Sequence, residues 1–239
     1  MMEKEKWNNT MYDRFKESLY SMADEKYKDF HRKLVPEGLG EIIGVRSPDI
    51  KKTAKDIVKN TDYESFLKIA GYGTYEETMV RGFVIGYSKA DIITRLGYLK
   101  DFIPHISNWA VCDGTAAAFK VKPHEMETVF EFIKPYTESR MEYEQRLAAV
   151  FLMDYFITGQ YIDSVLQIYG GIKSGRYYVN MAVAWGISVC FVKFPEITME
   201  FLKNNELDNF TYNKALQKII ESNRVDAEVK NIIRGMKRK

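Results

Sequence analysis

Four residues with chemically useful side chains recur at regular spacing along the chain. Trp109 and Asp113 are four residues apart, so they share one face of a predicted helix. Arg146 follows Trp109 after 37 residues, and Trp185 follows Arg146 after 39 residues. Carboxylates and electron-rich rings favour a cation, and a guanidinium suits a phosphate. If the four residues line one cleft, they could act on a substrate that carries both charges.

A structural interpretation of the same residues stays open. A tryptophan in an apolar helix usually belongs to the core, and an aspartate beside an arginine is often a structural ion pair. Tryptophan is the rarest residue here, because the chain contains only Trp7, Trp109 and Trp185. The near-equal intervals between rare residues are the reason to consider a site.

The other common catalytic motifs are absent from the sequence. There is no P-loop, no dinucleotide fingerprint and no Gly-x-Ser-x-Gly elbow. The three histidines, His31, His105 and His124, lie far apart, which argues against a histidine-based metal site. We therefore expect no metal and no cofactor, and any catalysis must use carboxylates, aromatic rings and arginine.

The elements that must position these residues are predicted to be helices throughout. Segment after segment has the i, i+3, i+4 apolar spacing of an amphipathic helix, and no clean alternation indicates a strand. Ser47 is predicted to cap a helix that runs to about residue 59, with Pro48 and Asp49 in its first turn. The later predicted helices cover residues 62–70, 75–87, 88–101, 107–120, 123–135, 138–157, 163–170, 176–193, 195–203, 211–222 and 226–236.

From residue 88 onward these helices group into pairs. The pairs cover residues 88–120, 123–157, 163–193 and 195–222, a period that is typical of an α-solenoid of HEAT-like repeats. The rival interpretation is an irregular helical bundle. We predict a single domain over residues 1–239, with the apolar segment 146–157 in the middle of the stack. In a solenoid, residues one repeat apart stand side by side, so Trp109, Arg146 and Trp185 are predicted to share a surface.

Composition indicates a globular protein, and the low number of cysteines suits a reducing compartment. The chain is 46% hydrophobic and 28% charged with six prolines, which excludes disorder and collagen-like structure. The longest apolar run, residues 147–153, is far short of the ~20 residues of a membrane span, so no membrane partner is expected. The two cysteines, Cys112 and Cys190, are predicted to be buried apolar residues.

Charge is balanced overall but clustered locally. The net charge is +2, which by itself points to no partner. Basic residues gather in residues 45–59, including Arg46 and Lys51, and again in residues 229–239. Such clusters are usually solvated surface, and the alternative is an anionic partner, above all nucleic acid.

At these residues the sequence resembles the AlkD-type alkylpurine DNA glycosylases, which are built from HEAT-like repeats. The resemblance covers most of the chain from about residue 10. The matching stretches are Gly44-Val45-Arg46-Ser47-Pro48-Asp49, Asn108-Trp109-Ala110-Val111-Cys112-Asp113, Gln145-Arg146-Leu147-Ala148-Ala149-Val150-Phe151-Leu152-Met153, Tyr177-Tyr178-Val179-Asn180-Met181-Ala182-Val183-Ala184-Trp185 and Asn213-Lys214-Ala215-Leu216-Gln217-Lys218-Ile219.

The resemblance implies a superhelix of stacked helix pairs with a concave, basic face for duplex DNA. It implies a monomeric enzyme, cytoplasmic and at the bacterial nucleoid when bound to DNA, that removes N3-alkyladenine and N7-alkylguanine as the first step of base excision repair. Some family members keep the fold without glycosylase activity. A noncatalytic module that binds DNA structure or a protein partner is therefore the alternative.

The resemblance also implies a role for each site residue. Asp113 would stabilise the positive charge that develops on the deoxyribose and orient the attacking water. Trp109 and Trp185 would pack against the sugar and favour its cationic form. The phosphate-binding residues would be Arg146, Arg46 and Lys51. The family is thought to hold the damaged nucleotide through its backbone and to leave the base in the duplex, unlike enzymes that flip the base into a pocket.

Overall fold

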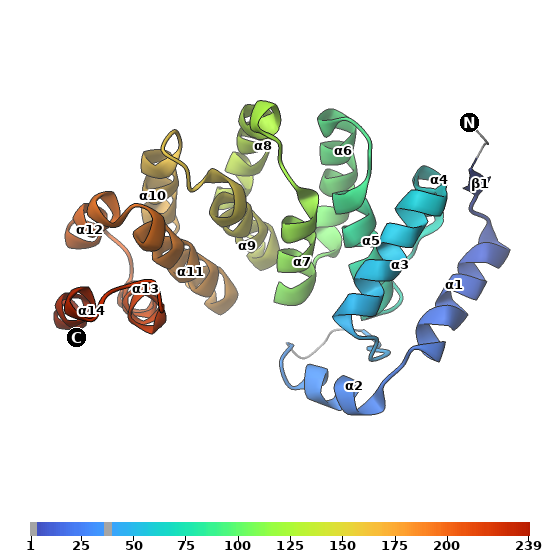
Figure 1. Ribbon diagram of the computed structural model, residues 1–239, viewed down its shortest axis with the longest axis horizontal. Helices are drawn as coiled ribbons and strands as arrows, with labels where there is room; N and C mark the ends of the chain where they lie inside the picture. Colours follow the sequence, from blue (N-terminus) through green and yellow to red (C-terminus); the bar gives the residue numbers. More distant parts are fainter. Residues whose placement is uncertain (1–3, 36–39) are drawn as a thin grey trace. The chain divides into compact units, whose positions relative to one another are not determined.

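The computed structural model describes residues 4–35 and 40–239, in which helices dominate (Figure 1). The α-helices are α1 (Asn9–Ser21), α2 (Glu25–Arg32), α3 (Ser47–Asn60), α4 (Tyr63–Ile69), α5 (Tyr75–Tyr87), α6 (Ile92–Phe102), α7 (Trp109–Phe119), α8 (Met126–Ile133), α9 (Glu142–Phe151), α10 (Ile162–Gly171), α11 (Tyr177–Lys193), α12 (Pro195–Lys203), α13 (Asn209–Glu221) and α14 (Ala227–Gly235). Shorter helical turns are η1 (Ile103–His105), η2 (Pro123–Glu125), η3 (Lys134–Glu138) and η4 (Leu152–Phe156). The predicted all-α fold is confirmed.

Contacts divide the chain into two compact units, Met1–Lys120 and Val121–Lys239. In the first unit, α5 packs against α3 and α7; in the second, α11 packs against α9 and α13. In the second unit, α9, α11 and α13 are the second helices of three successive predicted pairs and lie side by side, which is the packing of a solenoid. In the first unit only α6 and α7 fall within a predicted pair. The single domain over residues 1–239 stays a prediction.

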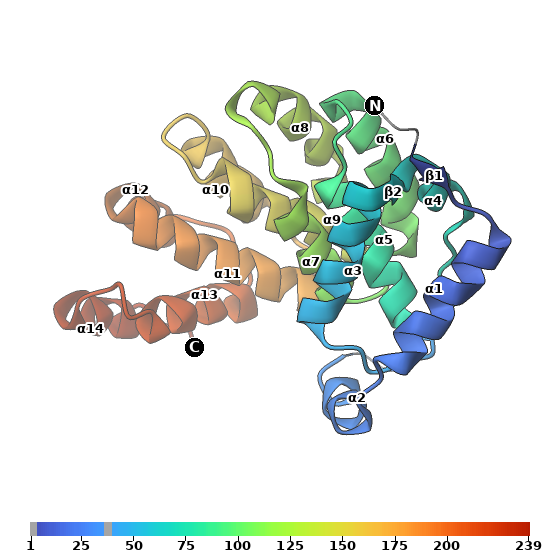
Figure 2. The same cartoon turned by 45° about the vertical axis from the view of Figure 1, so that its right-hand side comes forward.

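The first unit also contains one very short parallel strand pair. Strand β1 (Glu5–Lys6) pairs with β2 (Thr61–Asp62), close to α4 (Figure 2). Trp7 anchors the segment that follows β1: its indole N–H donates to Thr61 Oγ1 at 2.8 Å, and its ring packs edge-on against Phe66 with centroids 4.9 Å apart. Trp7 is thus a structural residue.

Two features of the N-terminal region differ from the prediction. The predicted helices begin at residue 47, whereas α1 and α2 precede it. Both are polar helices that bury few side chains, Phe15 and Leu19 in α1 and His31 in α2, so few apolar residues mark them in the sequence. The predicted cap, Ser47, is also wrong, because α3 starts at Ser47 itself and the cap residue is Arg46, whose backbone is extended.

A buried carboxylate fixes the loop in front of α3. Glu76 is fully buried, and its oxygens accept hydrogen bonds from the backbone N–H groups of Ile43, Gly44 and Val45 at 2.9, 2.7 and 3.2 Å. Gly44 has a φ of +100°, and a Cβ there would lie 2.7 Å from Lys28 Cβ. These bonds hold the loop directly before α3.

The close approach of α5 and α7 depends on a glycine, and it positions the helix that carries Trp109 and Asp113. A Cβ on Gly86 would lie 2.6 Å from Ala118 Cβ and 2.7 Å from the Ala118 carbonyl carbon. We expect Gly86→Ala to lower the free energy of unfolding by about 1–3 kcal/mol, because the overlap exceeds the gain in helix propensity. Urea unfolding followed by circular dichroism measures the change.

The matched control is Gly97→Ala in α6, where a Cβ would meet nothing within 4 Å. This substitution should leave stability unchanged or raise it by up to about 1 kcal/mol. Equal effects of the two substitutions would contradict a packing role for Gly86.

Candidate functional site

Helix α7 carries Trp109 and Asp113 within its first turns. The helix starts at Trp109 because the buried Asn108 caps it: Asn108 Oδ1 accepts a hydrogen bond from the N–H of Val111 at 2.9 Å. Trp109 and Asp113 are both half-buried. The indole N–H of Trp109 donates to the carbonyl oxygen of Leu34 at 3.0 Å. That bond fixes the orientation of the ring beside the carboxylate four residues later.

In the second unit, Arg146 ties α9 to the start of α11. Its side chain is only 6% exposed, and Nη1 donates to the carbonyl oxygen of Tyr178 at 2.6 Å. Glu142, also on α9, accepts a hydrogen bond from the N–H of Tyr178 at 3.0 Å. Both backbone groups of Tyr178 are thus held by α9. Arg146 therefore has a structural role, and its binding of a phosphate stays a prediction.

Trp185 is the exposed member of the predicted set. It lies on α11 and is 41% exposed, whereas most of that helix is buried. The indole borders a cleft of about 330 Å³ between α11 and the end of α13. The cleft is lined by Trp185, Ser188, Val189, Val192, Lys193, Lys218, Glu221, Ser222 and Arg224. Three cations and one carboxylate beside an exposed indole suit an anionic ligand.

The predicted phosphate-binding residues of the first unit lie at the start of α3. Arg46 is exposed and bonds Asp24 Oδ2 at 2.7 Å, with its guanidinium 5.2 Å from the ring centre of Tyr27. The backbone N–H of Tyr27 and the Arg46 guanidinium lower the pKa of Asp24. Lys51 is exposed, with Nζ 5.7 Å from the ring centre of Phe83. Both cations stay accessible to an anion.

The C-terminal basic cluster is partly structural. Arg238 donates from Nη1 to the carbonyl oxygen of Leu207 at 2.6 Å and covers the ring of Tyr212 at 3.8 Å. Its guanidinium therefore fastens the chain end to the loop before α13. This use of Arg238 follows from tertiary contacts and has no signal in the sequence.

The four predicted residues fall into two pairs. Trp109 and Asp113 share α7 in the first unit, while Arg146 and Trp185 lie on the packed helices α9 and α11 of the second. Their convergence on one surface stays a prediction.

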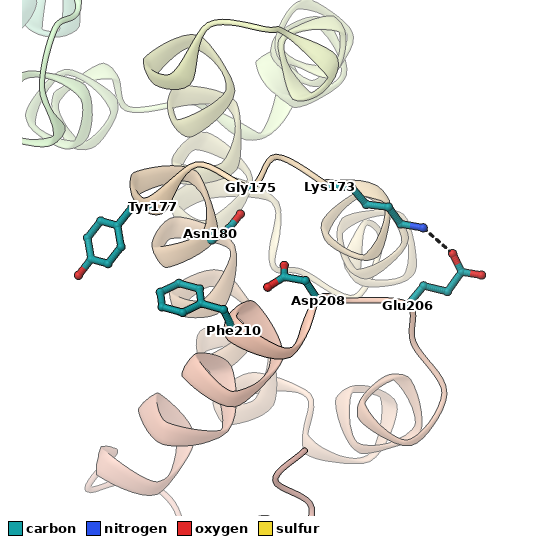
Figure 3. A pocket seen from close by; sticks show the side chains of 7 residues that line it. All are labelled: Lys173, Gly175, Tyr177, Asn180, Glu206, Asp208 and Phe210. Atoms are coloured by element: carbon teal, nitrogen blue, oxygen red, sulfur yellow. Dashed lines mark hydrogen bonds and ion pairs between the residues drawn. The ribbon is translucent and has the colours of Figure 1, made fainter. Parts of the chain in front are cut away.

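Sequence reasoning missed a second cleft, of about 580 Å³, at the starts of α11 and α13 (Figure 3). Two of its lining residues, Tyr177 and Phe210, are exposed aromatic side chains, 56% and 40% accessible. The two aromatic residues lie in different helices, and only tertiary packing brings them together. Their positions in the sequence therefore do not indicate a cleft.

Both cysteines are buried, as predicted. Burial raises the pKa of the Cys190 thiol to about 12, so this group stays protonated and unreactive near neutral pH. We expect Ellman's reagent at pH 8 to label neither thiol of the native protein and both after denaturation. Rapid labelling of the native protein would contradict this burial.

Two absences hold for residues 4–35 and 40–239. No group of three or more histidine, cysteine, aspartate or glutamate side chains there is arranged to hold a metal ion. Among the helices in this part of the chain, none combines the length and the apolar character needed to cross a bilayer.

Comparison with known proteins gives a match over most of the chain. The model of a family described as DNA alkylation repair enzyme matches residues 15–219. No curated protein matches the chain. The matched range contains Trp109, Asp113, Arg146 and Trp185.

Proposed function

Because the chain belongs to the family of DNA alkylation repair enzymes, we propose that it is a DNA glycosylase. Its substrates are cationic alkylated purines, N3-alkyladenine and N7-alkylguanine, in duplex DNA, and the bond it hydrolyses is the N-glycosidic bond. The observation that carries this proposal is the pair on α7: a half-buried carboxylate, Asp113, one turn beyond Trp109, whose indole is held by Leu34.

One carboxylate is sufficient for this reaction. Glycoside hydrolysis normally needs a second carboxyl group to protonate the leaving group. A purine alkylated at N3 or N7 already carries a positive charge and departs neutral, so no general acid is required. As the bond to the base breaks, positive charge grows on the deoxyribose. Asp113 stabilises this charge and orients the water that attacks C1′.

The two tryptophans act on the same developing cation. An indole face is electron-rich and attracts a cation placed over it, with an interaction of about 0.5–2 kcal/mol. Trp109 presents a ring of fixed orientation, and Trp185 presents an exposed one. In this proposal both rings pack against the deoxyribose of the damaged nucleotide.

Phosphate contacts hold the duplex. Lys218 and Arg224, which line the cleft beside Trp185, are the cations that we assign to phosphates nearest that indole. In this proposal Arg46 and Lys51 at the start of α3, together with Arg146, contribute further contacts. This set supplies affinity without base recognition.

Salt dependence tests the phosphate contacts. The logarithm of duplex affinity should fall with the logarithm of salt concentration, with a slope of roughly 0.9 per phosphate neutralised. Replacing both Lys218 and Arg224 by glutamine should flatten the slope by about 0.9 for each phosphate that is no longer neutralised. The control is Lys203→Gln, an exposed residue at the end of α12. An unchanged slope in the double variant would remove these residues from the DNA-binding set.

The glycosylase proposal is tested by incubating the protein with duplex DNA that carries N7-methylguanine. The expected result is free N7-methylguanine, detected by liquid chromatography, and an intact strand with an abasic site. Tight binding of the duplex without release of the base would favour the noncatalytic binding module instead.

A further inference from the structure

The cleft at the starts of α11 and α13 has the features of a binding site that the proposed excision reaction does not use. It measures about 580 Å³ and lies within the second unit (Figure 3). Its lining consists of Lys173, Gly175, Tyr177, Asn180, Glu206, Asp208 and Phe210. None of these residues has a role in the proposed cleavage of the glycosidic bond.

One end of the cleft is aromatic. Tyr177 opens α11 and Phe210 lies in the first turn of α13, with ring centroids 5.9 Å apart and an angle of 51° between the rings. Both side chains are largely exposed, at 56% and 40%. Lys214, one turn after Phe210, places its ammonium 5.8 Å from the Phe210 ring centre. Exposed aromatic faces beside a lysine are a stacking surface for nucleobases.

The middle of the cleft is polar and buried. Asn180 is only 5% exposed, and its side chain extends into the cleft (Figure 3). Within the described part of the chain, no hydrogen bond is made by its side-chain amide. Because this amide borders the open cleft, it is available to a ligand bound there.

A carboxylate that also lines the cleft is held in a fixed position. Asp208 caps α13, accepting hydrogen bonds from the N–H and the hydroxyl of Thr211 at 3.0 and 2.6 Å. At the far end, Lys173 and Glu206 form an ion pair at 2.7 Å. The two carboxylates disfavour a phosphate inside the cleft, so the polar groups face a ligand that carries donors and little negative charge.

We infer that this cleft binds an unpaired nucleobase that carries an exocyclic amino group. The aromatic end stacks on the face of the base. The Asn180 amide offers a donor and an acceptor to its edge, and Asp208 accepts a hydrogen bond from the amino group. Adenine and cytosine present such an edge, whereas thymine has no amino group. The inference rests on the DNA binding of the proposed function, and the base it describes is held without being excised.

The test compares duplexes that differ in one extrahelical base. Fluorescence anisotropy measures the affinity of the full-length protein for a fully paired duplex and for duplexes with a single bulged adenine, cytosine or thymine. The bulged adenine and cytosine duplexes should bind on the order of 10-fold more tightly than the paired duplex, the range that stacking of one base on an aromatic ring produces. Bulged thymine should gain less.

Variants separate stacking from edge recognition. Tyr177→Leu combined with Phe210→Leu should abolish the preference for any bulge. Asn180→Leu, and the isosteric Asn180→Asp as a second variant, should keep a preference for bulges but bind bulged adenine less tightly than the wild type does, because the amide donor to the base edge is lost. Tyr20→Leu removes an exposed aromatic side chain from α1 and is the matched control, with no expected effect.

The inference is overturned by equal affinity of wild-type protein for bulged and paired duplexes, or by a bulge preference that survives the Tyr177 and Phe210 double variant. A wild-type protein that binds no duplex overturns it as well. Release of N7-methylguanine is measured on the same proteins. Excision without bulge preference leaves the glycosylase proposal intact, and bulge preference without excision leaves the base cleft intact.

Discussion

Asp113→Asn should lower the rate of N7-methylguanine excision by on the order of 100-fold or more. Asparagine keeps the shape of the side chain and removes the negative charge that stabilises the sugar cation. Duplex affinity should stay equal or become tighter, because the carboxylate repels nearby phosphates. Single-turnover excision with protein in excess isolates the chemical step from binding, and anisotropy measures the affinity.

The control for charge alone is Asp101→Asn, an exposed residue on α6. It should excise at the wild-type rate. Equal rates for wild type and Asp113→Asn would refute the assignment of Asp113. A parallel loss of affinity and rate would point to a role in binding instead.

The second large effect is selectivity for positively charged lesions. A general acid contributes about 100- to 10,000-fold to the departure of a neutral leaving group. The proposed site supplies one carboxylate and no such acid, so hypoxanthine and uracil should be excised at least ~100-fold more slowly than N7-methylguanine. Bulky N7-alkyl groups should be accepted, because recognition through the backbone does not enclose the base. Time courses on duplexes that differ only in the lesion measure both properties.

Rapid release of hypoxanthine would show that a general acid acts in the site. Asp154, which is exposed on η4 directly after the helix of Arg146, would then be the first residue to replace. Asp154→Asn should in that case abolish hypoxanthine release and spare N7-methylguanine.

Local signals in the sequence were sufficient to predict most of the helices. The predicted helix over 75–87 coincides with α5, which Thr74 caps, and the helix over 195–203 coincides with α12, which begins with Pro195. The helix predicted over 88–101 starts later, at Ile92, because the Asp91 carboxylate caps the N–H of Thr94. A cap residue thus decides a boundary that apolar periodicity leaves open.

The i, i+4 spacing was also sufficient to place Trp109 and Asp113 on one helix, because that relation is local. Tertiary contacts are different. The bonds from Trp109 to Leu34 and from Arg146 to Tyr178 join segments far apart in sequence, and tertiary packing buries Asn180. A periodic sequence pattern does not indicate such contacts. The cleft that Tyr177 and Phe210 line could therefore not be predicted from the sequence.

The most direct test of the central claim identifies the bond that is broken. Duplex DNA with a single N7-methylguanine is treated with the wild-type protein in water enriched in ¹⁸O, and the products are analysed by mass spectrometry. Hydrolysis of the glycosidic bond predicts unlabelled free N7-methylguanine and one ¹⁸O atom on C1′ of the abasic sugar. Guanine that stays in the strand after loss of its methyl group, or DNA that is bound and unchanged, would contradict the account.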